Sequence, residues 1–244
     1  MVEGRIIKAK DQAKLEKYIR GEVWMSVALI ELYLSTNKVN LAENLIKQME
    51  ANETIIEDTR QGVYLKYAKA LILKHSNRMR DKSEAERIFI DVLETEALEG
   101  HLHISRIKIP TLKHLIELRM DELRLYNQEE VLEEINTLIS QLVDLTENQG
   151  LFLIFTEILI LKAKLEMIQG RFDEAKIQLE RAIELAHLKG LNLLKKQAED
   201  ELTNIRNDYE KMRDFVELNP SWYERINHLR ISEYISKANR FMSQ

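Results

Sequence analysis

The sequence predicts an all-α fold, a solenoid of antiparallel helix pairs that ends in a capping pair of helices. The 244 residues include only 7 Gly and 2 Pro, where average usage gives roughly 17 and 12, so few residues interrupt helices. Apolar residues recur every three or four positions along most of the chain, the period of a helix with one buried face. Five glycines are spaced by 41, 38, 50 and 40 residues, and a period near 40 fits a repeated unit of two helices and two turns. These are Gly21, Gly62, Gly100, Gly150 and Gly190.

The first helix pair is predicted within residues 22–49. Residues 1–20 precede it as a basic helix or arm. Apolar side chains then cover a broad helical face from Glu22 to Leu34, and a polar stretch at Ser35–Asn37 interrupts the pattern. A second apolar face follows over residues 41–49 at three- and four-residue spacing, which completes the pair.

The second pair begins with an apolar helix over Val63–Leu73. Its second helix is predicted to begin at Ser83, because Glu86 lies three residues later and the two residues match a capping box. In the third pair, Pro110 lies inside an apolar pattern that runs from Leu102 to Leu125. A proline removes one helical hydrogen bond and clashes with the preceding turn, so either a helix begins near Pro110 or a long helix is kinked there.

A regular apolar stripe over residues 131–145 completes the third pair. The fourth pair has the strongest pattern: a helix over Leu151–Ile168, a turn at Gln169–Phe172 and a helix over Asp173–Leu188. Lys189 and Gly190 end it with a cation in the last turn and a glycine just beyond, as many helices end.

The C-terminal region departs from this pattern and predicts two capping helices. The first is a long helix over Leu191–Val216. Asn219 and Pro220 end it and begin the last helix as cap and first helical residue, and that helix extends from Trp222 to Phe241. A stack of repeats must cover the apolar face at its end, which is the role we assign to these helices.

The predicted domain organisation is one domain, with repeats in residues 1–190 and the capping helices of residues 191–244 packed on them. We expect a monomer. The heptad-like spacing within residues 191–216 leaves a dimer seam as the alternative.

The composition favours a cytoplasmic protein. The chain lacks cysteine, which excludes disulfides and thiol chemistry. No apolar run reaches the roughly 18 residues that a membrane span needs. The net charge of −5 argues against general nucleic-acid binding. We therefore expect neither membrane nor nucleic acid among the partners.

Small and bulky residues alternate along residues 156–187 in a manner that resembles a tetratricopeptide repeat. The residues that carry this resemblance are Ala163, Gly170, Phe172, Ala175, Leu179 and Ala182. Looser copies occur in the first two pairs. Two departures are Leu159, where the family has Trp, and the region His187–Gly190, where it often has Pro. The resemblance implies a right-handed superhelix whose concave groove, lined by the first helix of each pair, binds a protein or peptide.

One subtype of this family clamps a C-terminal carboxylate with Lys, Asn and Arg on successive first helices. The corresponding positions hold Val27 and Glu31 in the first pair, and Ile160, Leu161 and Lys164 in the fourth. Most of the required donors are missing, so this function is not transferred.

The sequence predicts neither an enzyme nor a bound cofactor or metal. It contains no glycine-rich phosphate loop and no GxSxG or HExxH motif. His101 and His103 are two residues apart, which points them to different sides of a helix. The paired acidic residues at 129–130 and 133–134 read as a solvated face. A helical-bundle enzyme with a carboxylate metal site remains the minor alternative.

Basic residues predict one rim of the groove and thereby an acidic peptide or protein tail as partner. The predicted partner-binding residues are Arg78, Arg80, Arg106, Lys108, Lys113 and Lys164. Trp24, Tyr64, Tyr67 and Trp222 are ligand anchors or, as aromatics at helical spacing usually are, core residues. The preferred function is thus a helical-repeat adaptor. The alternative is a regulatory sensor that binds a small effector, which a closed, dry pocket beneath the C-terminal helices would favour.

Overall fold

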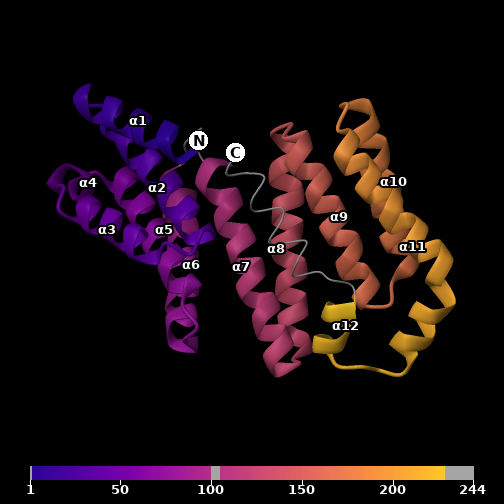
Figure 1. Cartoon of the computed structure of the whole chain (residues 1–244). Helices are drawn as coiled ribbons and strands as arrows, with labels where there is room; N and C mark the ends of the chain where they lie inside the picture. Colours follow the sequence, from indigo (N-terminus) through magenta and orange to yellow (C-terminus); the bar gives the residue numbers. More distant parts are fainter. Residues whose placement is uncertain (1, 100–104, 229–244) are drawn as a thin grey trace. The chain divides into compact units, whose positions relative to one another are not determined.

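The computed structural model describes residues 2–99 and 105–228, in which every regular element is a helix (Figure 1). Most helices contact mainly their neighbours in the chain, as sequential antiparallel pairs. The all-α prediction is confirmed. The helices are α1 (Val2–Leu15), α2 (Ile19–Ser35), α3 (Val39–Glu50), α4 (Glu53–Glu57), α5 (Thr59–His75), α6 (Met79–Glu99), α7 (Ser105–Tyr126), α8 (Glu129–Asn148), α9 (Phe152–Ile168), α10 (Phe172–Leu188), α11 (Asn192–Glu217) and α12 (Trp222–His228).

The chain divides into two compact units between Leu115 and Ile116. Unit 1 contains α1 to α6 and the beginning of α7, and unit 2 contains the rest of α7 and α8 to α12. This division does not coincide with residue 190, where the sequence predicts a change from repeats to capping helices; that organisation stays a prediction. No helix within 2–99 or 105–228 is both long enough and apolar enough to span a bilayer.

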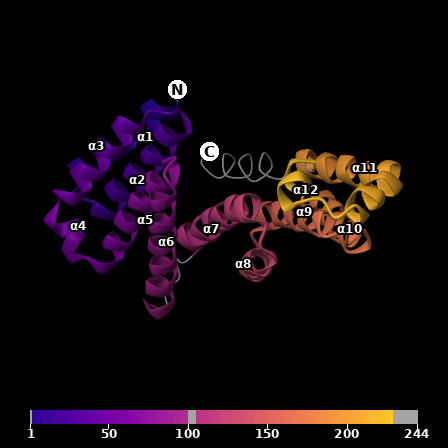
Figure 2. The ribbon, with the colours of Figure 1, turned by 90° about the horizontal axis from the view of Figure 1, so that it is seen from below.

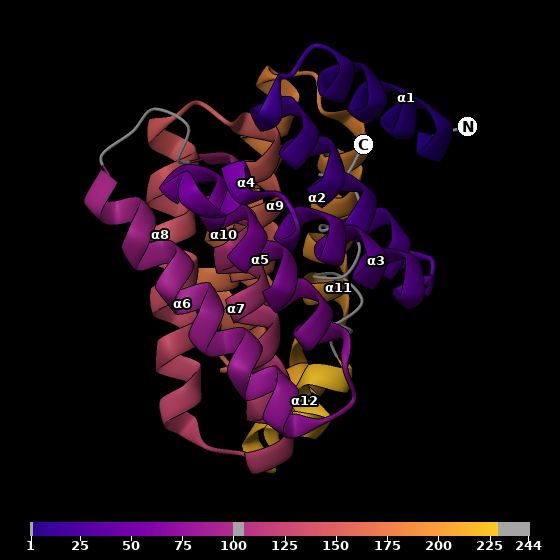
Figure 3. The same cartoon turned by 90° about the vertical axis from the view of Figure 1, so that its left-hand side faces the viewer.

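In unit 1, α2 contacts α1, α3 and α5, and α5 pairs with α6 (Figure 3). Ala68 on α5 and both Ala85 and Phe89 on α6 have no solvent exposure. The short helix α4 was not predicted. Its signal is local, since the side chain of Asn52 accepts a hydrogen bond from the Thr54 amide at 3.2 Å, and asparagine is a preferred residue at a helix start.

The predicted helix start at Ser83 is wrong. Helix α6 begins four residues earlier, at Met79, and the Ser83 hydroxyl donates to the Met79 carbonyl at 3.1 Å. The start of α6 is organised instead by Ser76, which accepts from the Arg78 amide at 3.2 Å and donates to the Asp81 carboxylate at 2.6 Å. A capping-box pattern inside a helix therefore misled the prediction, because Ser also bonds well to the carbonyl four residues back.

Pro110 lies inside helix α7, and because residues 100–104 are outside the described part, both alternatives for the start of this helix stay predictions. The described part of α7 begins at Ser105, so Pro110 lies in its second turn. Proline has no N–H, so one helical hydrogen bond is missing at this turn.

In unit 2, the predicted helices of the fourth pair are confirmed to within one residue as α9 and α10. Helices α9, α10 and α11 lie side by side (Figure 2). Ala163 on α9 and both Ala175 and Ala182 on α10 have no solvent exposure. Helix α9 is buried over almost its whole surface from Phe155 onward. Side chains without a γ-carbon at these positions allow the two helices to approach closely.

Five helices end in the same type of turn. In each, a left-handed residue ends the helix, and the next amide donates to the carbonyl five residues back at 2.7 to 2.9 Å. This is the Schellman arrangement, and a new helix begins immediately after it. The left-handed residues are Lys17, Asn37, Gly150, Gly170 and Gly190. Several of them lie 20 residues apart, the length of one helix and one turn.

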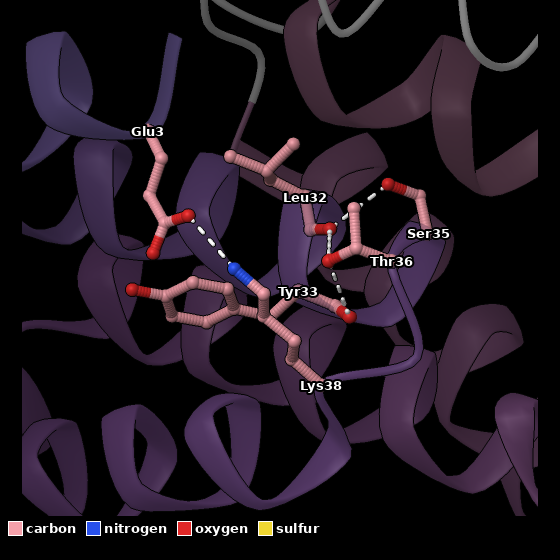
Figure 4. A network of polar contacts seen from close by, with 6 residues as sticks. All are labelled: Glu3, Leu32, Tyr33, Ser35, Thr36 and Lys38. Atoms are coloured by element: carbon pink, nitrogen blue, oxygen red, sulfur yellow. Dashed lines mark hydrogen bonds and ion pairs between the residues drawn. The ribbon is translucent and has the colours of Figure 1, made fainter. Parts of the chain in front are cut away.

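The turn at Asn37 shows how polar side chains support this reversal (Figure 4). The hydroxyls of Ser35 and Thr36 both donate to the Leu32 carbonyl at 2.9 Å. Lys38, just after the turn, forms an ion pair with Glu3 at 2.9 Å. The Lys38 ammonium lowers the pKa of the Glu3 carboxyl, so this contact favours the docking of α1 at neutral pH.

The predicted start of the last helix is also wrong. Asn219 has a left-handed φ of 50° and α12 begins only at Trp222. Ser221 and Glu224 form the actual capping box: the Ser221 amide donates to the Glu224 carboxylate at 2.8 Å, and the Glu224 amide donates to the Ser221 hydroxyl at 3.3 Å. The predicted extension of this helix to Phe241 lies outside the described residues.

The α9–α10 crossing gives the first testable prediction. Ala175→Leu places three extra carbons at a fully buried position, and overpacking of this kind costs ~1–3 kcal/mol. The free energy of unfolding, measured by chemical denaturation, should fall by this amount. Lys176→Leu, at the adjacent exposed position, should change it little. Equal effects from both substitutions would contradict the packing described here.

Two glycine turns form a matched pair for a second prediction. Gly170 and Gly190 have φ of 77° and 69°, so alanine at either site pays about 1 kcal/mol for a left-handed conformation. A Cβ at Gly170 would also lie 2.9 Å from Val216 Cγ1, whereas a Cβ at Gly190 meets nothing within 4 Å. Gly170→Ala should therefore lower the melting temperature more than Gly190→Ala. Adding Val216→Ala should remove part of that difference; no recovery would count against the close approach.

Candidate functional site

The six predicted partner-binding residues differ in exposure; five of them belong to unit 1, and Lys164 belongs to unit 2. Arg78 and Arg80 are exposed at the start of α6, and Lys108 is partly exposed on α7. Arg106 also lies on α7, but its side chain is outside the described part. Lys113 on α7 and Lys164 on α9 are only 3% and 5% exposed. Burial removes these two from the exposed rim that the sequence predicts. A binding role for the exposed residues stays a prediction.

Lys164 has a structural role within unit 2. Its ammonium pairs with Glu201 of α11 at 2.5 Å, and its side chain is almost fully enclosed. Removing either partner from a buried pair leaves an uncompensated charge. The pair therefore fixes α11 against α9 rather than presenting a cation to a partner.

Unit 1 contains a polar and aromatic cluster. Tyr67, buried on α5, donates to the Glu31 carboxylate of α2 at 2.9 Å. The His114 ring stacks on Phe89 with centroids 5.4 Å apart and lies 6.0 Å from the Tyr67 ring centroid. Burial raises the pKa of Glu31, and the hydrogen bond from Tyr67 opposes that shift. The cluster joins side chains of α2, α5, α6 and α7, which is a core arrangement; of the predicted aromatic anchors, Tyr67 is thus a core residue.

Unit 2 contains a polar cleft of about 490 Å³. It lies where the start of α8, the α9–α10 turn and α12 come together, at the lower end of these helices in Figure 1. This site was not predicted from the sequence, because its residues come from three separate segments of the chain. The lining residues are Asn127, Glu129, Leu132, Gln169, Arg171, Asn219, Pro220, Trp222 and Arg225.

Arg225 is the most enclosed charged group of the cleft, at 8% exposure. Its guanidinium donates to three neutral acceptors: the Pro220 carbonyl at 3.1 Å, the Ile168 carbonyl at 3.0 Å and the Asn219 side-chain oxygen at 3.0 Å. It also lies over the Trp222 ring, 4.6 Å from its centroid. Burial lowers the pKa of Arg225, and the charge of Glu129 opposes this shift. Arg225 thus holds the α11–α12 loop against the end of α9.

Arg171 borders the same cleft from the α9–α10 turn. Its guanidinium forms an ion pair with Glu166 and donates to the Gln169 side-chain oxygen at 2.5 Å. Trp222 is held by its amide, which donates to the side-chain oxygen of Asn127 at 2.6 Å. These contacts fix the wall of the cleft around a partly exposed indole.

A second cavity nearby is apolar but has a volume of only about 10 Å³. It lies between the end of α9 and the end of α11, with Phe172 and Phe215 in its wall. This space is too small for an effector. The dry pocket that would favour a sensor is therefore not provided by this cavity. Within the described ranges, no three His, Asp or Glu residues are arranged to hold a metal ion.

Comparison of the chain with protein-family models, curated proteins and solved structures found no match. Its function is therefore inferred from its own geometry.

The raised pKa of Glu31 gives a third prediction. Since the folded-state pKa lies above the ordinary value, ionisation of Glu31 costs stability as the pH rises through that interval. Glu31→Gln keeps an acceptor for Tyr67 and should raise the melting temperature at pH 7. The gain should vanish below about pH 4, where the carboxyl is protonated in both states.

The control for this substitution is Tyr67→Phe. Loss of the hydroxyl leaves the Glu31 carboxylate without this donor and should destabilise the fold by about 1–3 kcal/mol. A melting temperature for Glu31→Gln that is lower than that of the wild type at pH 7 would show that the carboxylate is not penalised by burial.

Proposed function

We propose that this chain is a non-enzymatic helical-repeat module that binds a protein or peptide segment. The observation that carries the proposal is the recurring left-handed turn, which joins sequential antiparallel helices. The fully buried alanines of α9 and α10, which are Ala163, Ala175 and Ala182, support the resemblance to tetratricopeptide repeats. On this proposal the repeats form a right-handed superhelix with a groove, and docking on a preformed surface needs no chemical step.

An acidic partner is the specific form of this proposal. Arg78 and Arg80 project from the exposed start of α6 in unit 1, where they can meet acidic side chains without the cost of desolvating a buried charge. Complementary charges of this kind set the association rate and the choice of partner. A cytoplasmic setting is consistent with the absence of cysteine.

A second candidate is a sensor module that binds a small effector. The polar cleft of unit 2 favours it, because about 490 Å³ lies within the range of small-molecule sites, roughly 300–1,000 Å³. In this case the repeats would transmit the presence of the effector to a partner.

The peptide-binding proposal predicts selection of acidic sequences from a random peptide library displayed to the whole chain. Selected peptides, measured by fluorescence anisotropy, should bind about tenfold more weakly to the Arg78→Glu, Arg80→Glu double variant, which corresponds to roughly 1.4 kcal/mol. The matched control is Arg206→Glu with Arg213→Glu, two exposed arginines of α11.

Three outcomes would contradict this proposal. No peptide is selected, the selected peptides show no excess of Asp and Glu, or the two double variants weaken binding equally. Equal weakening by both double variants would show that the loss of peptide affinity comes from the overall net charge of the protein and not from Arg78 and Arg80.

A further inference from the structure

We propose that the cleft of unit 2 is a binding site for a small oxyanion ligand, one that carries a phosphate or carboxylate group. This inference rests on the second candidate function, the small-effector sensor, and is independent of the peptide-binding proposal. It combines a buried guanidinium, two helix N-termini and a cavity of suitable size.

The charge of Arg225 is held by neutral hydrogen-bond acceptors. Its hydrogen-bond acceptors among the described residues are two backbone carbonyls and one side-chain amide, and no carboxylate of those residues lies within ion-pair distance. A guanidinium has five N–H donors, of which these bonds engage three. A buried cation with neutral partners retains a positive potential in a region of low dielectric, and Arg225 directs it into the cleft wall.

Two helix N-termini border the cleft. Helix α8 begins at Glu129 and α10 at Phe172, and neither Gln128 nor Arg171 at their caps provides a side-chain hydrogen bond. The first amides of a helix lack partners within it, and the helix dipole favours an anion there. Both starts border the cleft, through Glu129 and Arg171. Two uncapped N-termini beside one buried arginine favour an oxyanion over a neutral ligand.

The wall of the cleft contains charged side chains of both signs. Arg171 is already paired with Glu166, so it contributes donors more than net charge. Glu129 is exposed and opposes the anion, and it is close enough to Arg225 to influence its pKa. We therefore expect opposite effects on anion affinity: loss of the Glu129 charge strengthens anion binding, and loss of Arg171 or Arg225 weakens it.

The remaining wall suits a small organic anion. Asn127, Gln169 and Asn219 offer amide groups, and the partly exposed Trp222 ring offers a flat surface. Trp222 also reports on the site, since the only other tryptophan is Trp24 of unit 1. In a Trp24→Phe background, fluorescence emission therefore comes from Trp222 alone.

The test titrates the full chain carrying Trp24→Phe with inorganic phosphate and, separately, with citrate, at constant ionic strength maintained with sodium chloride. We expect a saturable change in Trp222 emission with at least one of the two anions. Phosphate alone would identify a phosphate-bearing ligand, and citrate alone a carboxylate-bearing ligand. The absence of a saturable change with both would overturn the proposal.

Variants locate the binding. Arg171→Gln should weaken the anion about tenfold through the loss of a charged hydrogen-bond donor, and Glu129→Gln should tighten it severalfold. Arg213→Gln, on the exposed surface of α11, is the control and should leave affinity unchanged. Arg225→Gln should abolish binding, but this residue also holds the α11–α12 loop, so its thermal melt is measured in parallel. Equal affinities for wild type, Arg171→Gln and Glu129→Gln would overturn the site even if Arg225→Gln lost binding.

The two proposals fail separately. If acidic peptides bind through Arg78 and Arg80 and no anion changes the emission of Trp222, the peptide-binding proposal is supported and the anion site in the cleft is contradicted. If anions bind and no peptide is selected, the anion site in the cleft is supported and the peptide-binding proposal is contradicted. Acidic peptides displaced by phosphate, with the same response to Arg171→Gln, would show that a peptide supplies the oxyanion, and would overturn the small-ligand form of the inference.

Discussion

The left-handed turn between successive helices is the constraint on which the rest of this structure depends. One residue with positive φ reverses the chain, and one hydrogen bond across six residues closes the reversal at 2.7 to 2.9 Å. The next helix begins at once, so it has to run antiparallel to its predecessor and in contact with it. Apolar stripes on both helices are thereby brought face to face without a long loop, whose closure would cost entropy. The choice of Gly in unit 2 and of Lys or Asn in unit 1 shows that hydrogen bonding, more than glycine itself, maintains the turn.

Once the turn sets the pairing, the size of the side chains sets the distance between helices. Ala163, Ala175 and Ala182 are completely buried between long apolar neighbours, so α9 can be enclosed almost entirely. The same close approach brings Val216 against Gly170. The turn at Gly170 therefore joins α9 to α10 and also contacts the end of α11. Local backbone conformation and tertiary packing are thus coupled at this residue.

The two enclosed cations of unit 2 illustrate different uses of charge. Lys164 meets the Glu201 carboxylate, so its charge is neutralised where it lies and α11 is fixed. Arg225 meets neutral oxygens, so its charge persists beside the cleft. Since an isolated buried charge is costly, three hydrogen bonds and the Trp222 ring reduce the cost without cancelling the potential. This contrast is the reason that the cleft, rather than the Lys164 pair, is the stronger candidate for a ligand.

The sequence by itself determined the helical class, most helix positions and the α9–α10 pair, because these depend on spacing within a few turns of one segment. It misplaced the starts of α6 and α12, since Ser83 and Asn219 have competing local roles that only the surrounding contacts decide. The burial of individual lysines could not be predicted from the sequence either. Lys113 and Lys164 were predicted as exposed cations, and the arrangement of neighbouring helices encloses them. One segment of the cleft nevertheless has a local sequence signal: Ser221 and Glu224 match a capping box, and Trp222 lies three residues before Arg225. What only the tertiary structure decided is that this segment meets the α9–α10 turn and the start of α8, because contacts between residues far apart in the chain leave no periodic signal in its sequence.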